Sequence, residues 1–191
     1  MHLFFWIISI AITLYTGWVY VPAILKWKIK PHAFSWLPWT ILTSIAFVVQ
    51  IKNGENIWGF GPLAASALVC AVIFLLSLKY GEKHITRTDI IFFTLSMITI
   101  PVWIMTKNDL LAVILICLID WLAFYPTWRK SWKKPFEEDI SMYSLSSFKG
   151  FLGLFSLGNL ILVNWLYPVF LVLVNLFFAL YLVWRRRVMR K

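Results

Sequence analysis

The chain contains 191 residues, of which 61% are hydrophobic and only 14% are charged. A water-soluble domain is typically about half apolar and about a quarter charged, and a domain of this size still exposes much of its surface. No single core is therefore large enough to bury the apolar excess. The composition disfavours a soluble enzyme, a nucleic-acid-binding domain and a disordered chain, and it predicts a protein whose main solvent is lipid.

Seven segments are apolar and long enough to cross a bilayer as helices, since a span needs about 20 residues. The predicted spans are residues 3–25, 33–51, 57–78, 90–105, 110–128, 141–163 and 166–184. Helices are expected because unpaired backbone groups are too costly in lipid. The first segment lacks a basic region and a small-residue cleavage site, so we interpret it as a retained span. The predicted fold class is all-α integral membrane, with seven transmembrane helices in one polytopic domain, residues 1–191.

The basic residues are unevenly distributed over the connections between these spans. The net charge is +10, and 15 of the 18 lysines and arginines fall on one set of connections and on the C-terminal tail. They are Lys26, Lys28, Lys30, Lys79, Lys83, Arg87, Arg129, Lys130, Lys133, Lys134, Arg185, Arg186, Arg187, Arg190 and Lys191. The other side receives Lys52 and Lys107. The positive-inside rule predicts an outside N-terminus and a cytoplasmic C-terminus in a bacterial inner (plasma) membrane. Topology explains the charge, and no nucleic-acid partner is expected.

The sequence contains an internal repeat with an offset of 104 to 106 residues. The matched positions are Pro22 with Pro126, Lys26 with Lys130, Lys30 with Lys134, Pro31 with Pro135, Ser35 with Ser141 and Pro62 with Pro168. The repeat predicts two three-helix bundles, residues 1–80 and 108–187, joined by a linker helix at residues 88–106. Because the linker crosses the membrane once, both bundles have the same orientation, which makes a 3+1+3 parallel repeat.

Pro22 and Pro126 lie in the cytoplasmic third of the first and fifth predicted spans. Each removes one backbone hydrogen bond and clashes with the preceding turn. A passive kink is common for a single proline in a membrane helix. We interpret the matched pair as two hinges, which let one end of a bundle open while the other end stays packed.

The stretch from Pro126 to Ser131, followed by Ser141, is similar to the proline, basic cluster and downstream serine of the PQ-loop superfamily, which includes the SWEET sugar transporters. The 3+1+3 helix pattern and the outside N-terminus also resemble this superfamily. The resemblance implies a transporter fold. Ala23 and Thr127 stand where many members have glutamine. Asn175 fits the place of the substrate-contacting asparagine of SWEET transporters, but residues 66–70 offer no counterpart. The resemblance therefore does not assign sugar as the substrate.

Asp120 and Lys149 are the ionisable residues inside the predicted spans. Such groups cost about 2.5–3.5 kcal/mol on insertion scales and indicate a functional role. Both lie about 12 Å from the cytoplasmic end of their helices, and opposite charges at one depth are expected to pair. Two interpretations remain: a static bridge that fixes helix packing, and a gate or proton-sensitive latch.

Asn159 and Asn175 are amides at mid-span positions of the sixth and seventh predicted helices. Each amide can donate and accept, so each could bind a polar solute or form an interhelical hydrogen bond. Together with Asp120 and the adjacent Trp121, they are the predicted substrate-binding residues.

Two other groups of residues are given structural roles. Trp36 and Trp39 share one helix face and could stack on a ring, although we interpret them first as interfacial anchors. The acidic residues 137–139 are expected to balance Lys133 and Lys134 in a solvated loop.

The sequence shows no pattern typical of a cofactor, metal or catalytic site. Cys70 and Cys117 lie in apolar runs and are interpreted as small buried hydrophobes. His2, His32 and His84 do not have zinc-site spacing. We expect no cofactor and no enzyme activity.

The predicted function is transport of a small polar solute by alternating access. With no large soluble domain and no nucleotide-binding loop, transport would be facilitated or ion-coupled. The expected partners are the lipid bilayer and the solute, and a homo-oligomer is compatible with the pattern. The alternative is a receptor, sensor or assembly protein with a transporter-like fold and no flux.

Overall fold

The structure is a computed structural model that describes residues 2–106 and 108–190. For residues 96, 99, 100, 102–104 and 106 it describes the backbone alone. Lys107 and Lys191, which enter the predicted topology, lie outside the described residues. The described chain is all-helical, with seven α-helices and one short 3-10 helix.

The helices follow the apolar segments of the sequence. Their bounds are α1 His2–Leu25, α2 Ala33–Lys52, α3 Ile57–Tyr80, α4 Arg87–Thr106, α5 Asp109–Lys133, η1 Pro135–Glu137, α6 Ile140–Leu154 and α7 Leu162–Met189. Five of them, α1, α2, α3, α5 and α7, are long and apolar enough to cross a membrane. This set of helices is compatible with a membrane protein.

Polar side chains fix where several helices begin. The Asn56 side chain accepts hydrogen bonds from the first backbone N–H groups of α3, and Asn108 and Asp139 do the same for α5 and α6. Such caps satisfy donors that have no partner inside the helix. The local sequence therefore determines these helix starts.

The sixth predicted span, residues 141–163, is wrong beyond Leu154. The helix α6 ends there, and residues 155–161 form a connection to α7. The backbone N–H groups of Gly158 and Asn159 donate to the Glu55 carboxylate, at 3.0 and 3.1 Å, instead of continuing the helical pattern. A distant acidic residue thus ends an apolar run that hydropathy alone would continue.

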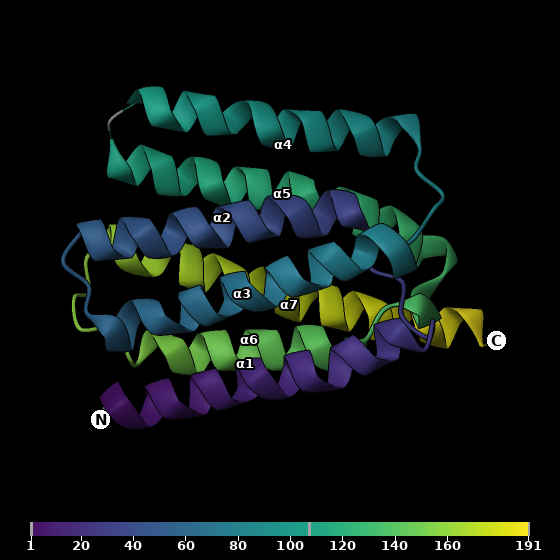
Figure 1. The fold of residues 1–191 in the computed structure, drawn as a ribbon, viewed down its shortest axis with the longest axis horizontal. Helices are drawn as coiled ribbons and strands as arrows, with labels where there is room; N and C mark the ends of the chain where they lie inside the picture. Colours follow the sequence, from purple (N-terminus) through teal and green to yellow (C-terminus); the bar gives the residue numbers. More distant parts are fainter. Residues whose placement is uncertain (1, 107, 191) are drawn as a thin grey trace.

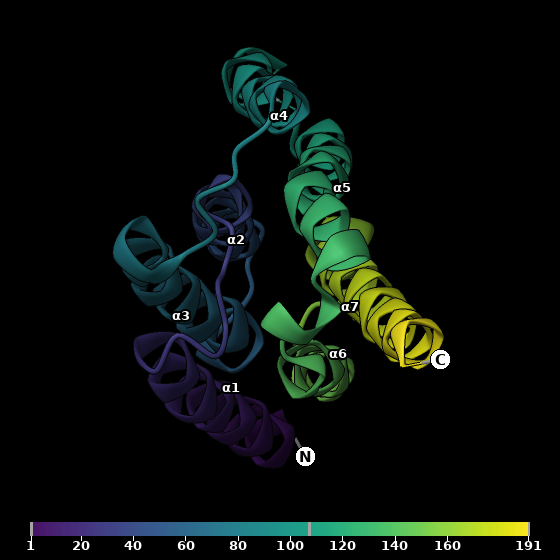
Figure 2. The same cartoon turned by 90° about the vertical axis from the view of Figure 1, so that its right-hand side faces the viewer.

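The helices form two rows that lie side by side (Figure 1, Figure 2). In one row α3 packs between α1 and α2, and in the other α7 packs between α5 and α6. The rows meet where α1 contacts α6 and where α2 contacts α5, and α4 packs on α5 at the edge. We call one end of the bundle the basic end. It contains the connections 26–32, 81–86 and 134–139 and the C-terminal end of α7. The other end is called the opposite end.

Large apolar side chains cover the outside of the bundle. Trp18 is 80% exposed and Leu68 is 71% exposed, and many leucine, isoleucine and phenylalanine side chains share this outward position. Several polar side chains are buried instead, including Gln50, Asp120 and Asn164. An apolar exterior around a partly polar interior is the arrangement expected in lipid.

Candidate functional site

A cavity of about 110 Å³ lies between the two rows of helices. One ordered water needs only about 10–15 Å³ on this measure, so the space admits several waters or a small solute. Its wall includes Ser9 of α1, Trp36, Trp39, Thr43 and Gln50 of α2, Ser66 and Cys70 of α3, Asp120 and Phe124 of α5, Met142, Tyr143 and Lys149 of α6, and Asn175 of α7. We call it the central cavity.

Asp120 brings a carboxylate to the cavity wall from the buried face of α5. Its side chain is 1% exposed, and Oδ1 accepts a hydrogen bond from the Tyr167 hydroxyl at 3.1 Å. The other oxygen, Oδ2, is buried with no partner among the described residues. A buried acceptor without a partner carries a desolvation cost, which a bound donor would relieve.

Lys149 brings a cation to the same cavity from α6. Its ammonium donates to the Ser66 hydroxyl at 3.1 Å, across the gap between the rows. The expected ion pair with Asp120 is wrong, because no such bridge occurs among the side chains that the structure describes. The physical reason is that α7 packs between α5 and α6, so the two helices are not neighbours. Both charges keep neutral partners.

Trp36 and Trp39 line the cavity rather than an interface with lipid headgroups. They are 2% and 6% exposed, and their rings meet edge-to-face with centroids 5.0 Å apart. Trp36 also packs on Tyr20, and Trp39 on Phe124. The interpretation as anchors is therefore wrong: these rings belong to the protein interior.

Several polar atoms of the cavity residues have no hydrogen-bond partner in the part of the chain that the structure describes. They are the indole nitrogens of Trp36 and Trp39, Oε1 of Gln50 and Oδ2 of Asp120. Buried polar groups in folded proteins are nearly always hydrogen-bonded, so a cluster of free ones is informative. The wall thus offers both donors and acceptors to a molecule inside it.

The remaining predicted site residues divide between the cavity and the rest of the molecule. Asn175 lines the cavity, and its amide donates to the Leu171 carbonyl at 2.8 Å. Asn159 lies in the connection after α6, where its amide donates to the Asn53 carbonyl at 3.1 Å. It is therefore not a mid-span amide, because α6 ends early.

Trp121 lies away from the central cavity. Successive residues differ by about 100° around a helix, so the residue after a buried aspartate faces another way. Trp121 is 50% exposed and packs near Trp128 on the same helix. The structure therefore separates it from Asp120, and its prediction as a wall residue is wrong.

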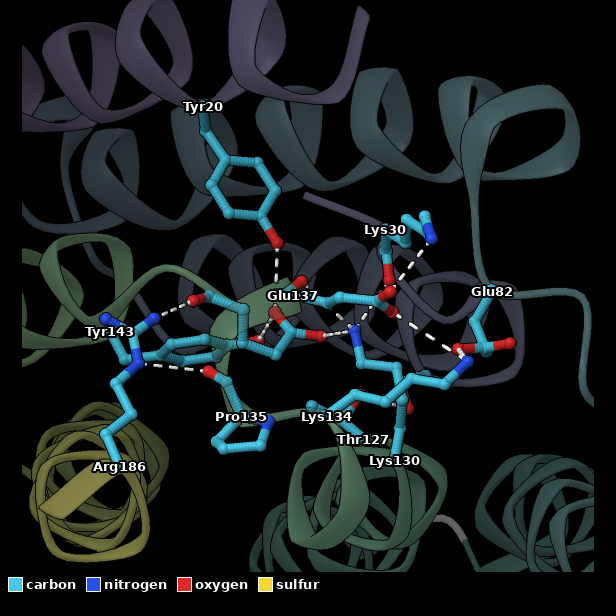
Figure 3. A network of polar contacts seen from close by, with 12 residues as sticks. Tyr20, Lys30, Glu82, Thr127, Lys130, Lys134, Pro135, Glu137, Tyr143 and Arg186 are labelled. Carbon is cyan, nitrogen blue, oxygen red and sulfur yellow. Dashed lines mark hydrogen bonds and ion pairs between the residues drawn. The ribbon is translucent and has the colours of Figure 1, made fainter. Parts of the chain in front are cut away.

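A second polar site, at the basic end, was not predicted from the sequence. Glu138 is fully buried, and its Oε2 accepts hydrogen bonds from the hydroxyls of Tyr20 and Tyr143, at 3.2 and 3.1 Å. Its Oε1 pairs with the Lys130 ammonium, whose side chain is 1% exposed. Tyr20, Lys130 and Tyr143 converge from α1, α5 and α6 (Figure 3). We call these four residues the Glu138 cluster.

The expectation of a solvated acidic loop is wrong for Glu138. The 3-10 turn of residues 135–137 reverses the chain after α5, and Asp139 caps α6. Between these two fixed points the Glu138 side chain is directed into the bundle. Glu137 does lie near Lys134, at 4.0 Å as the expectation requires, but its shorter ion pair is with Lys30, at 2.8 Å.

Further contacts tie the connections of the basic end together. The Lys130 ammonium also donates to the Lys30 carbonyl at 2.6 Å, and Arg186 of α7 donates to the backbone carbonyls of Pro135 and Glu138. The side chain of Lys134 pairs with Glu82 at 2.9 Å (Figure 3). The connections α1–α2, α3–α4 and α5–α6 therefore meet at one place.

The surroundings of Glu82 favour its ionised form in the pair with Lys134. Burial alone would raise the pKa of Glu82, but hydrogen bonds from the His84 backbone N–H and from the Lys134 ammonium outweigh it. Together with the charge of Lys134 they lower the pKa to about 2. Glu82 therefore remains ionised throughout the physiological range.

Polar contacts also close the opposite end. The Gln50 amide donates to the Asn164 carbonyl at 2.8 Å, and the Glu55 carboxylate binds the α6–α7 connection as described above. The side chains of Lys52 and Asp109 pair at 2.7 Å nearer the surface. The central cavity thus lies between two polar layers, one at each end of the bundle.

Comparison of the chain with protein-family models, with curated proteins and with solved structures finds no match. The function must therefore be argued from the geometry of the central cavity and the Glu138 cluster.

Proposed function

We propose that this protein is an inner-membrane transporter that moves a small polar solute by alternating access. The observation that carries the proposal is a cavity between two rows of helices whose wall includes Asp120, Lys149 and Asn175, with a separate polar layer beyond it at each end. Transport needs a site that opens to one side at a time, and the polar layers at the two ends would supply the two barriers. Flux would be facilitated or coupled to an ion.

The proposal includes seven spans and a 3+1+3 parallel repeat of PQ-loop or SWEET-like type. The order within the rows supports it, because the third helix of each predicted bundle, α3 and α7, packs between the other two. Pro62 and Pro168, which match in the sequence repeat, lie in these two helices. The α6 span is short, and beyond it the backbone N–H groups of Gly158 and Asn159 are satisfied by the Glu55 carboxylate, as non-helical backbone at membrane depth requires.

We also propose that the basic end is cytoplasmic and that the N-terminus is outside. The basic connections lie together at one end of the bundle, as the positive-inside rule requires of a cytoplasmic side. The Glu138 cluster then closes the cytoplasmic side of the cavity. Pro22 follows Tyr20 closely in α1, and Pro126 precedes Lys130 in α5, so bending at either proline would separate groups of this cluster.

A reversible crosslink tests alternating access directly. The Lys30 backbone N–H donates to the Glu137 carbonyl at 3.2 Å, so these positions are close enough for a disulfide. In a Cys70→Ala, Cys117→Ala background, the Lys30→Cys, Glu137→Cys variant would hold the basic end closed. Oxidation should reduce solute uptake into proteoliposomes to the leak level, and a reductant should restore it.

The two single-cysteine variants serve as controls, because neither can form the intramolecular bridge. Uptake that continues at the same rate after complete crosslinking would exclude movement at this end. If uptake of every compound in a solute library stays at the leak level, even without oxidation, the protein is not a transporter. The receptor, sensor or assembly alternative would then replace the proposal.

A further inference from the structure

An acidic and a basic side chain, Asp120 and Lys149, share the wall of the central cavity without pairing with each other. Asp120 has one oxygen bonded to the Tyr167 hydroxyl and one oxygen with no partner among the described atoms. Lys149 has three N–H donors, and its hydrogen bond of 3.1 Å to the Ser66 hydroxyl uses one of them. The helix α7 packs between their helices, so closing the gap between the two charges would require repacking of the bundle.

The energetic cost of this arrangement depends on what occupies the cavity. A buried charge is expensive unless it is paired and hydrogen-bonded. A solute with one positive charge would leave Lys149 unpaired, and a solute with one negative charge would leave Asp120 unpaired. A neutral solute would pair with neither. Only a molecule that carries both charges, at separate places, compensates both residues at once.

The aromatic part of the wall offers hydrogen-bond donors. The rings of Trp36 and Trp39 meet edge-to-face, and they also contact Tyr20 and Phe124. Their indole N–H donors are buried and have no partner among the described residues. Donors on α2 suit the acceptor oxygens of an anionic group, and Gln50 Oε1 offers an additional acceptor.

We infer that the solute is amphoteric, with a cationic N–H donor group that pairs with Asp120 and an anionic acceptor group that pairs with Lys149. The inference rests on the proposed transport function and names the substrate class of the same cavity. A volume of about 110 Å³ restricts the solute to a small molecule. The two charged groups of the solute would bind to different helices, α5 and α6. The distance between these groups along the solute should therefore determine which solutes bind.

Binding of a graded series of probes to the purified protein in detergent tests this inference. The series consists of ω-amino acids from glycine to 6-aminohexanoate, compared with pentylamine, pentanoate and 1,5-pentanediol. Thermal unfolding and titration calorimetry should detect binding of at least one ω-amino acid, with an optimum chain length. The singly charged and neutral probes should bind at least about tenfold more weakly, as expected for loss of one hydrogen bond to a charged group.

Variants identify the contacts, with matched controls outside the cavity. Asp120→Asn and Lys149→Gln should each weaken binding of the best ω-amino acid at least about tenfold. Asp109→Asn and Lys52→Gln make the same chemical changes in the surface pair at the opposite end and should leave the dissociation constant unchanged. If the Asp120 and Lys149 variants bind like the wild type, or if no ω-amino acid binds, the inference is wrong.

The outcomes separate this inference from the transport proposal. Uptake of a neutral polyol at a rate equal to or above that of every ω-amino acid would overturn the amphoteric class and leave transport intact. Binding of an ω-amino acid with wild-type selectivity, but with no uptake into proteoliposomes, would leave the ligand class intact and overturn transport.

Discussion

Tyr143 is a wall residue of the central cavity, and its hydroxyl donates to Glu138 at 3.1 Å. One side chain thus belongs both to the cavity and to the Glu138 cluster. A solute that displaces the Tyr143 ring would disturb the hydrogen bond to Glu138. The structure therefore contains a direct route by which occupancy of the cavity could alter the closure of the basic end.

The Lys130–Glu138 pair should be the most stabilising polar interaction at the basic end. The Glu138 carboxylate accepts from three donors, on Tyr20, Tyr143 and Lys130. Glu138→Gln replaces one of its acceptor oxygens with an amide nitrogen, and it leaves the Lys130 charge buried without a counter-ion. Breaking a buried pair by removing one partner typically costs about 3–5 kcal/mol. Denaturant titration in detergent should show a loss of this size, and the Lys130→Met, Glu138→Gln double variant should lose less than the sum of the two single changes.

Glu137→Gln provides the matched control for this experiment. It makes the same chemical change one residue earlier in the chain, in the partly exposed pair with Lys30. Surface pairs contribute about 0–1 kcal/mol, so the variant should stay within that range. Equal losses for the two glutamine variants would show that burial of Glu138 does not determine the strength of its pairing.

Loosening the Glu138 cluster should expose the cavity to reagents from the basic end. Cys70 lies on the cavity wall, so its labelling rate reports access in a Cys117→Ala background. Tyr20→Phe and Tyr143→Phe each remove one hydrogen bond to a carboxylate, which is worth about 1.5–3 kcal/mol. In vesicles with the basic end outside, a membrane-impermeant thiol reagent should label Cys70 about tenfold faster than in the parent protein.

Tyr181→Phe is the control for the labelling experiment, because this tyrosine packs against Trp128 and Trp184 and does not bond to Glu138. Its labelling rate should equal that of the parent. A rate that is unchanged in all three variants would contradict a role of the two hydroxyls in closing this end.

The parts of the molecule that could be predicted depend on local sequence. Apolar runs and capping side chains such as Asn56 and Asn108 determine most helix bounds, because both act over a few residues. Asp120 and Asn175 line the central cavity, since polar groups in a membrane helix tend to avoid the lipid-facing side. The placement of these two residues therefore follows from composition and helical geometry.

The parts that could not be predicted depend on contacts between distant segments. Glu138 bonds to Tyr20, which lies 118 residues earlier, and an acidic triplet near lysines gives no local signal of burial. Glu55 binds the backbone of Gly158 and Asn159 in the connection after α6, more than 100 residues later. The expected Asp120–Lys149 pair failed for the same reason, because depth along a helix does not reveal which helices are neighbours.

Pro126 should accelerate the conformational change that opens the basic end. Pro126→Ala restores a backbone donor inside α5 and removes the clash with the preceding turn, which stiffens the helix. We expect higher thermal stability together with slower solute exchange in proteoliposomes, by several-fold. Pro101→Ala in α4 is the control, since α4 lies at the edge of the bundle, and its exchange rate should be unchanged. Wild-type exchange in the Pro126→Ala variant would argue against a hinge at this position.

His32 should make the stability of the basic end depend on pH. His32 lies in the connection between α1 and α2 with its side chain buried, and both ring nitrogens lack a hydrogen bond among the described residues. Burial lowers the pKa of His32 to about 4. The negative charge of Asp89 raises the pKa, and the positive charges of Lys130 and Arg129 lower it. In the unfolded chain the pKa is about 6.5.

Between pH 6.5 and 4 the unfolded chain therefore binds a proton that the folded protein does not. Stability must fall as the pH decreases through this window, by up to about 3 kcal/mol in total. His32→Phe keeps a planar ring beside Phe34 but cannot titrate, so its unfolding temperature should depend less on pH in this range. Thermal unfolding in detergent at a series of pH values measures the difference, and parallel curves for the two proteins would show that His32 is not the titrating group.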